Sequence, residues 1–259
     1  MGKGKTYLVS GSSRGVGLAL VKELLAKPDN RTVFAAARSP QKSEELQKLA
    51  EKHKDRLHIV TFDVTSGDSA KEAAAQVEKI VGGKGLDVLI NNAGTSEDLV
   101  PPLDTPDEKL KLTFMTNAVG PIIAYKYFKS LLDKGETKMI INFASNYGSI
   151  TLASEPLKDS SKATPLDHTQ IAYKASKAAV NMETVIIAED TKEAGFTVIS
   201  LHPGVVDTDM GSRPQEIVDS AKPEISPEDT AKAQVELYDR LTKKDTGKFF
   251  GYKGDILPW

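Results

Sequence analysis

The chain has 259 residues, 39% apolar and 27% charged, which is enough to fill the core of one large domain or two small ones. A net charge of -2 argues against a general role on nucleic acid or membrane surfaces. Cysteine is absent and the four histidines lack metal-ligand spacing, so disulfides, thiolate catalysis and a metal site are not expected. With no signal-peptide core or membrane-length apolar run, the expected location is cytoplasmic.

Short apolar segments alternate with helical segments along the chain. The predicted strands are residues 6–10, 32–37, 57–62, 86–90, 139–143 and 197–201, with a final edge strand at 249–252. Helices are predicted after the glycine turn that ends at Gly17, through about Leu25, and from Ser39-Pro40 and about 68–81. Further helices are predicted from a capping box at Thr105 through Asn117 to about Leu132, at 172–189, and after Ser226.

This alternation predicts an α/β fold, a single-domain Rossmann-type doubly wound parallel sheet with helices on both faces. No linker or internal repeat divides the chain, so residues 1–259 are expected to form one domain. Two long loops, about 148–166 and 203–225, follow strands on the ligand-binding side of such a sheet. We expect them to form a substrate mouth, and a mobile surface insertion is the alternative.

A glycine-rich turn joins the first strand to the first helix. Gly11, Gly15 and Gly17 let the backbone bend sharply and approach a pyrophosphate at the helix N-terminus. The second strand ends without a carboxylate, and Arg38 follows it, while Arg14 lies inside the turn. Arginine pairs well with phosphate, so we expect NADPH to bind about tenfold or more better than NADH.

Tyr173 and Lys177 lie four residues apart on one predicted helix and therefore on one face. An ammonium beside a phenol favours the phenolate and brings its pKa toward the working pH, where proton transfer is efficient. Taken alone, this spacing also fits an ordinary amphipathic helix.

Several such stretches occur in order, and together they carry a family resemblance. They are SGSSRGVG (10–17), DV (63–64), NNAG (91–94), Asn117, FASNYG (143–148), YKASK (173–177) and HPGVVDT (202–208). The chain resembles the short-chain dehydrogenase/reductase family over essentially its whole length. VKELLAKPDN (21–30), SKAAVN (176–181) and GYKGDILPW (251–259) are more narrowly similar to fungal norsolorinic-acid-ketoreductase-like members.

The resemblance implies roles for particular residues. Ser145 would hydrogen-bond the substrate carbonyl, Tyr173 would donate the proton, Lys177 would hold the nicotinamide ribose and lower the Tyr pKa, and Asn117 would kink its helix around a water. Cofactor-binding positions would be Gly11, Ser13, Arg14, Gly15, Val16, Gly17, Arg38, Asp63, Val64, Asn92, Ala93, Gly94, Tyr173, Lys177, Pro203, Gly204, Val206 and Thr208. The distance in sequence from Ser145 to Tyr173 is longer than in many members, which indicates an insertion beside the substrate mouth.

The function predicted from these features is a cytoplasmic NADPH-dependent ketoreductase that acts on a bulky aromatic or polyketide-like ketone, as in secondary metabolism. One alternative is an NADP(H)-binding redox sensor without turnover, and a less favoured one is a dinucleotide-fold methyltransferase. An apolar face is consistent with a homodimer or homotetramer, or with packing on the sheet alone; it comprises Phe114, Ile122, Ile123, Val180, Val185 and Ile186. His202 is expected to pack beside the cofactor loop rather than to act in catalysis.

Overall fold

The computed structural model describes residues 4–96, 99–162, 168–207 and 225–259. Seven strands in these ranges form one sheet of order β3-β2-β1-β4-β5-β6-β7, and all neighbouring pairs are parallel. The strands are β1 (Thr6–Ser10), β2 (Thr32–Ala37), β3 (Leu57–Thr61), β4 (Val88–Asn91), β5 (Met139–Phe143), β6 (Thr197–His202) and β7 (Lys248–Gly251). The predicted doubly wound parallel sheet, with an edge strand near the C-terminus, is confirmed.

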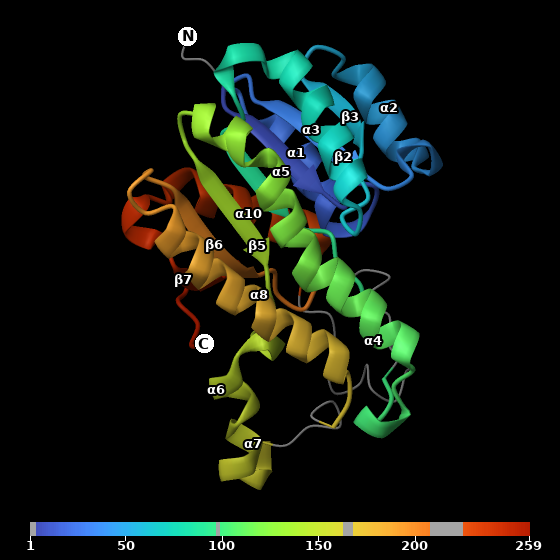
Figure 1. Ribbon diagram of the computed structural model, residues 1–259, viewed down its shortest axis with the longest axis vertical. Helices are drawn as coiled ribbons and strands as arrows, with labels where there is room; N and C mark the ends of the chain where they lie inside the picture. The colour runs from blue at the N-terminus through green and yellow to red at the C-terminus, as the bar shows by residue number, and fades with distance from the viewer. Residues whose placement is uncertain (1–3, 97–98, 163–167, 208–224) are drawn as a thin grey trace.

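Helices cover both faces of the sheet (Figure 1). One face packs against α1 (Gly15–Ala26), α2 (Glu44–Lys52) and α10 (Pro227–Arg240). The other packs against α3 (Gly67–Val81), α5 (Gly120–Lys134) and α8 (Ile171–Asp190). The sheet and its two helical layers therefore form one body with two apolar layers, as expected for a single domain.

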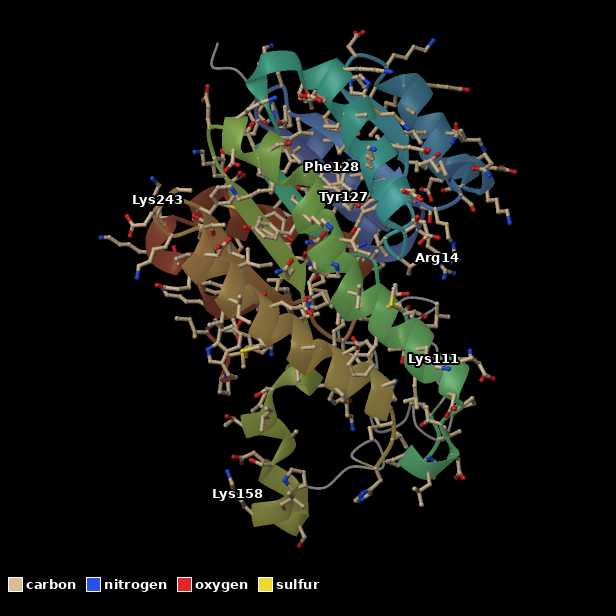
Figure 2. All side chains as sticks on the ribbon, viewed as in Figure 1. Arg14, Lys111, Tyr127, Phe128, Lys158 and Lys243 are labelled. Atoms are coloured by element: carbon tan, nitrogen blue, oxygen red, sulfur yellow. The ribbon has the colours of Figure 1, made fainter. Side chains whose placement is uncertain are left out.

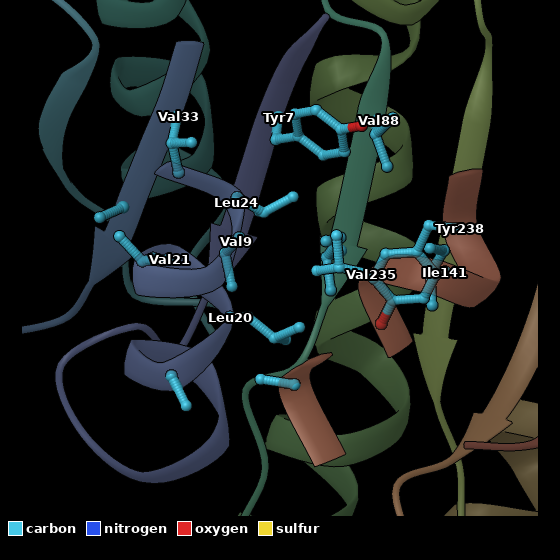
Figure 3. Packing of buried hydrophobic residues seen from close by; sticks show 14 of the residues in the cluster. Tyr7, Val9, Leu20, Val21, Leu24, Val33, Val88, Ile141, Val235 and Tyr238 are labelled. Carbon is cyan, nitrogen blue, oxygen red and sulfur yellow. The ribbon is translucent and has the colours of Figure 1, made fainter. Parts of the chain in front are cut away.

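Alternate residues of each central strand serve these two layers. Tyr7 and Val9 of β1 pack toward α1 and α10, whereas Leu8 packs toward α3 and α5. Figure 3 shows Tyr7 and Val9 beside Leu24 of α1, with Val235 and Tyr238 of α10 on the same side. A strand buried on both faces reads as a continuous apolar run, which is why TYLVS was recognisable in the sequence.

Most charged side chains lie on the outer surface. Lys111, Lys158 and Lys243 are exposed on three different elements (Figure 2). Phe128 of α5 is fully buried instead, with its ring centroid 5.7 Å from that of Phe62. In the predicted apolar face, Val180 is also fully buried, so it packs inside the molecule and cannot belong to an external surface.

Two predicted helix starts are wrong. Pro40–Lys42 forms a single 3₁₀ turn, and α2 begins at Glu44, where the Ser43 hydroxyl accepts from the Leu46 N–H. Acidic residues directly after Ser43 favour that start because the helix N-terminus is electropositive. The Thr105 hydroxyl donates to the Pro101 carbonyl and caps nothing, so no capping box forms. The Ser226 cap of α10 is confirmed by its bond from the Asp229 N–H.

The long helix predicted through Asn117 is continuous but not uniform. It comprises α4 (Asp107–Phe114), a π-helical segment (Met115–Val119) and α5. The predicted loop at 148–166 is helical in part, with α6 (Ile150–Ala153), α7 (Glu155–Lys158) and a 3₁₀ turn at Ser160–Lys162. Ser149 starts this segment by accepting from the Leu152 N–H. Residues 163–166 and 208–224 of the two predicted loops lie outside the described ranges.

Candidate active site

One cavity of about 690 Å³ lies at the carboxyl ends of the central strands. Its volume is in the range of ligand sites, about 300–1,000 Å³. Eighteen of the predicted site residues line it, namely Gly11, Ser13, Arg14, Gly15, Val16, Gly17, Arg38, Asp63, Val64, Asn92, Ala93, Gly94, Ser145, Tyr173, Lys177, Pro203, Gly204 and Val206. Asn117 lies behind the lining, and Thr208 is outside the described residues.

The turn after β1 needs its glycines. Gly11 has φ +67°, and a Cβ there would lie 2.8 Å from the Ala93 Cα. A Cβ on Gly17 would lie 2.3 Å from the Gly11 carbonyl oxygen. The turn therefore forms a bare backbone surface at the start of α1, where helix N–H groups favour a phosphate. This cradle fits the pyrophosphate of a dinucleotide.

Asn92 holds that turn against β4. Its side-chain N–H₂ donates to the carbonyls of Ser10 at 2.8 Å and Gly11 at 3.2 Å. The Ser10 hydroxyl accepts from the backbone N–H groups of Asn92 and Ala93, each at 3.1 Å. Asn92 was predicted to line the cofactor site, and it does line the cavity, but its amide is engaged in positioning the glycine turn.

The nucleotide end of the cavity carries two cations. Arg14 and Arg38 are exposed and line the cavity beside the ends of β1 and β2. The Asp63 carboxylate is held locally, since it accepts from the N–H of Thr65 at 2.9 Å and from its hydroxyl at 2.7 Å. Two cationic side chains thus line the cavity after β1 and β2, and Arg38 stands where a carboxylate that binds a ribose hydroxyl is found in many dinucleotide sites.

Tyr173 and Lys177 share one space on α8. The Lys177 ammonium lies 5.6 Å from the centre of the Tyr173 ring and donates to the Phe143 carbonyl at 2.5 Å. Only 4% of Lys177 is exposed, and this burial lowers its pKa to about 8 against a partly opposing effect of Glu183. The lysine is thus poised to titrate near physiological pH.

Ser145 lies two residues after β5 and directly precedes the 3₁₀ turn Asn146–Gly148. Its hydroxyl accepts from the Tyr147 N–H at 3.2 Å, and 4% of the residue is exposed. The turn rests directly on α8, where the Asn181 side chain donates to the Gly148 carbonyl. A Cβ on Gly148 would lie 2.6 Å from the Lys177 carbonyl carbon, so this close approach requires glycine. Ser145, Tyr173 and Lys177 are therefore brought to one cavity.

Asn117 connects the π-helical segment to the loop after β4. Its side chain makes two bonds of 2.8 Å with the Thr95 backbone and donates to the Ser176 hydroxyl at 3.0 Å. The π-helical segment Met115–Val119 includes this residue and interrupts the regular α-helix. The predicted water beside Asn117 stays a prediction.

Sequence reasoning missed several lining residues. Ser96 and Gln170 line the cavity next to recognised motifs, NNAG and YKASK, and their proximity to those motifs was the available signal. His202 also lines it, and burial lowers its pKa to about 4, so the ring is neutral at physiological pH. This agrees with the expected packing role of His202.

Neither a metal site nor a membrane helix is found in the described ranges. No group of three or more candidate side chains there could hold a metal ion. No helix in the same part of the chain is both long and apolar enough to cross a membrane.

The fold and site together define a class of protein. A parallel sheet, a glycine turn after its first strand and a Ser-Tyr-Lys group at one cavity are the features of a dinucleotide-binding α/β protein with proton-transfer groups. The short chain dehydrogenase family model matches residues 5–217, so the chain belongs to this family.

Relatives match over nearly their whole length. An uncharacterised oxidoreductase of Schizosaccharomyces pombe is 40% identical, with 99% of this chain and 98% of the relative covered. A short chain dehydrogenase of Penicillium aethiopicum is 32% identical, with 98% and 99% covered. The narrower similarity to norsolorinic-acid-ketoreductase-like members stays a prediction.

Solved structures are similar as well. The NADPH-bound carbonyl reductase from chicken fatty liver has a TM-score of 0.85 and 32% identity, covering 99% of this chain and 100% of that one. The carbonyl reductase Sniffer of Drosophila melanogaster also has a TM-score of 0.85, with 29% identity and full coverage of both chains.

Proposed function

We propose that this protein is an NADPH-dependent ketoreductase that reduces a ketone to a secondary alcohol by hydride transfer. The observation that carries the proposal is the convergence of Ser145, Tyr173 and Lys177 on the cavity that also contains the glycine turn. The similarity to carbonyl reductases, one of them bound to NADPH, supports it. The same residues can serve alcohol oxidation in the reverse direction.

In this proposal Ser145 and Tyr173 act on the carbonyl oxygen of the substrate, and Lys177 acts on Tyr173 and on the cofactor. The nicotinamide dinucleotide, when bound, supplies the hydride. Negative charge then builds on the carbonyl oxygen, and donors aimed at it stabilise the transition state most. The Ser145 hydroxyl donates a hydrogen bond to this oxygen, and Tyr173 transfers its proton to it. The Lys177 ammonium favours the resulting phenolate and holds the ribose hydroxyls.

Cofactor preference is proposed to come from Arg14 and Arg38. Their cationic side chains suit a 2′-phosphate and leave NADH without an equivalent partner. We expect NADPH to bind at least about tenfold more tightly, about 1.4 kcal/mol, in a fluorescence titration. Arg38→Leu should narrow this ratio. Equal affinities in the unaltered protein would contradict the assignment.

We further propose a small-molecule ketone or alcohol as substrate, a cytoplasmic location and a homodimer or homotetramer. Exposed apolar side chains on the neighbouring helices α5 and α8, including Ile122, Val185 and Ile186, support self-association. Size-exclusion chromatography with light scattering measures the oligomeric state directly. A substrate of bulky aromatic or polyketide-like type follows from the sequence resemblance.

The proposed activity is tested by following NADPH absorbance with small, aryl and polycyclic ketones. Tyr173→Phe removes the proton donor, so turnover should fall roughly a thousandfold or more while NADPH affinity is kept. Near-normal turnover in this variant would remove Tyr173 as the acid. Tight NADPH binding without turnover of any ketone by the unaltered protein would favour the redox-sensor alternative.

A further inference from the structure

Gln170, which lines the cavity, has a costly backbone conformation. It directly precedes α8, three residues before Tyr173, and its backbone is left-handed, with φ 59° and ψ 42°. For a residue with a side chain this conformation costs about 1–2 kcal/mol. Only 7% of Gln170 is exposed, and it lines the cavity. Strain of this kind at a candidate active site indicates a functional constraint.

One atom of the Gln170 amide is buried and unpaired. The Nε2 group donates to the Ser96 hydroxyl at 2.8 Å, which fixes one end of the amide. The carbonyl oxygen Oε1 has no hydrogen-bond partner among the residues that the structure describes. A buried acceptor without a partner costs about 1–3 kcal/mol. A bound ligand that donates a hydrogen bond would recover this cost.

The position of Gln170 points to the substrate rather than the nucleotide. The glycine turn and Arg38 lie at the ends of β1 and β2, whereas Gln170 lies in the turn before Tyr173 and bonds Ser96 beyond β4. Gln170 and Tyr173 are three residues apart in the chain and line the same cavity, together with Ser145. A group bound to Gln170 would therefore share this cavity with a carbonyl held by Tyr173.

We propose that Gln170 is a specificity residue whose Oε1 accepts a hydrogen bond from a hydroxyl of the substrate, so that the enzyme selects hydroxyketones. This inference rests on the proposed ketoreductase function. A ketone that lacks the hydroxyl leaves Oε1 buried and unpaired, and sites of this kind reject the missing donor far more strongly than apolar pockets reject a missing methylene. Ser96 acts as the positioning residue for the amide.

The test compares 2-hydroxyacetophenone with acetophenone, which lacks the hydroxyl, in the unaltered protein and in Gln170→Met. Methionine keeps the length of the side chain and removes the acceptor. We expect the unaltered protein to prefer the hydroxyketone, and the ratio of kcat/KM values for the two ketones to fall at least about tenfold in the variant. The exposed Gln76→Met of α3 is the matched control and should keep the ratio. NADPH fluorescence and urea unfolding establish that the Gln170 variant binds cofactor and is folded.

Each other outcome overturns the inference. A ratio unchanged in Gln170→Met, or no preference in the unaltered protein, removes the proposed hydrogen bond. If the unaltered protein instead prefers the diketone 1-phenyl-1,2-propanedione over acetophenone, and Gln170→Met loses that preference, the amide acts as a hydrogen-bond donor to the substrate. A tenfold loss of NADPH affinity in a folded variant would place Gln170 on the cofactor. If the unaltered protein reduces no ketone in the wider panel, the proposed ketoreductase function itself is contradicted. The outcomes above differ from this one because in each of them the unaltered protein still reduces a ketone.

Discussion

At the scale of single residues, Lys177 links the proposed catalysis to folding stability. Its ammonium is buried beside Tyr173 and is satisfied in part by the Phe143 carbonyl. Burial lowers the pKa of Lys177 from 10.5 to about 8, so the folded protein loses this proton more readily than the unfolded chain. The charge that the proposed mechanism needs is therefore maintained at the expense of folding stability.

This shift predicts a pH-dependent stability. Between about pH 8 and 10 the unfolded chain binds the Lys177 proton and the folded protein does not, so the free energy of unfolding rises with pH. Relative to Lys177→Met, the unaltered protein should gain about 2 kcal/mol over this interval. Urea unfolding at both pH values measures the change, with the exposed Lys126→Met as control. Parallel pH profiles for the unaltered protein and Lys177→Met would contradict the prediction.

At the scale of elements, the site depends on how α8 sits against the sheet. A buried polar chain runs from Asn91 of β4 through Asn142 of β5 to Thr184 of α8, and Ser200 of β6 also bonds Thr184. Gly148, in the turn that follows Ser145, lies close to the backbone of Lys177 on the same helix α8. The relative position of the three candidate catalytic side chains is thus set by contacts outside the cavity.

Gly148→Ala should disturb that arrangement. The new methyl would lie 2.6 Å from the Lys177 carbonyl carbon, so the turn carrying Ser145 must move away from α8. We expect turnover to fall at least about tenfold, and the free energy of unfolding to drop by about 1–3 kcal/mol. Steady-state kinetics and urea unfolding report the two effects. Gly83→Ala, where a Cβ meets nothing within 4 Å, is the control; equal behaviour of the two variants would refute the close-approach argument.

Sequence reasoning succeeded where periodicity or spacing carries the information. The i,i+4 spacing placed Tyr173 and Lys177 together, and apolar runs located the strands. Helix starts were harder, because Ser39 and Ser43 are both good caps and the choice depends on the residues that follow. The left-handed backbone of Gln170 and the engagement of Asn92 with the glycine turn arise from tertiary contacts, which no local pattern encodes.

At the scale of the whole molecule, Arg31 joins distant parts of the chain. It lies just before β2 with 3% of its surface exposed, and it donates to both oxygens of Asp29 and of Asp239 in α10. Its guanidinium also lies 5.4 Å from the centre of the Tyr7 ring. The side chains of Asp29 and Asp239 are 47% and 35% exposed, whereas the side chain of Arg31 is 4% exposed. The ion pairs therefore join a buried cation to two carboxylates that water can reach.

Because the arginine is buried and its two carboxylate partners are partly exposed, removing a carboxylate should lower the free energy of unfolding more than removing the arginine. Asp239→Ala leaves a buried guanidinium with half of its carboxylate partners, and should lower the free energy of unfolding by about 2 kcal/mol. Arg31→Met should cost less, because water solvates the two carboxylates left behind. Urea unfolding of both variants ranks them. A larger loss in Arg31→Met would show that the contact with the Tyr7 ring and local packing dominate instead.

The order of the sheet has a consequence for how the protein is made. Every strand after β1 pairs with a strand that precedes it in the chain, because β2 and β4 join β1, β3 joins β2, and β5, β6 and β7 each join the strand before them. A chain emerging from the ribosome can therefore extend its sheet outward as synthesis proceeds. No later strand has to be inserted between two that are already paired in this sheet. A chain whose synthesis stops early lacks the strands that pair last, whereas a chain without β1 lacks the strand on which the sheet begins to form.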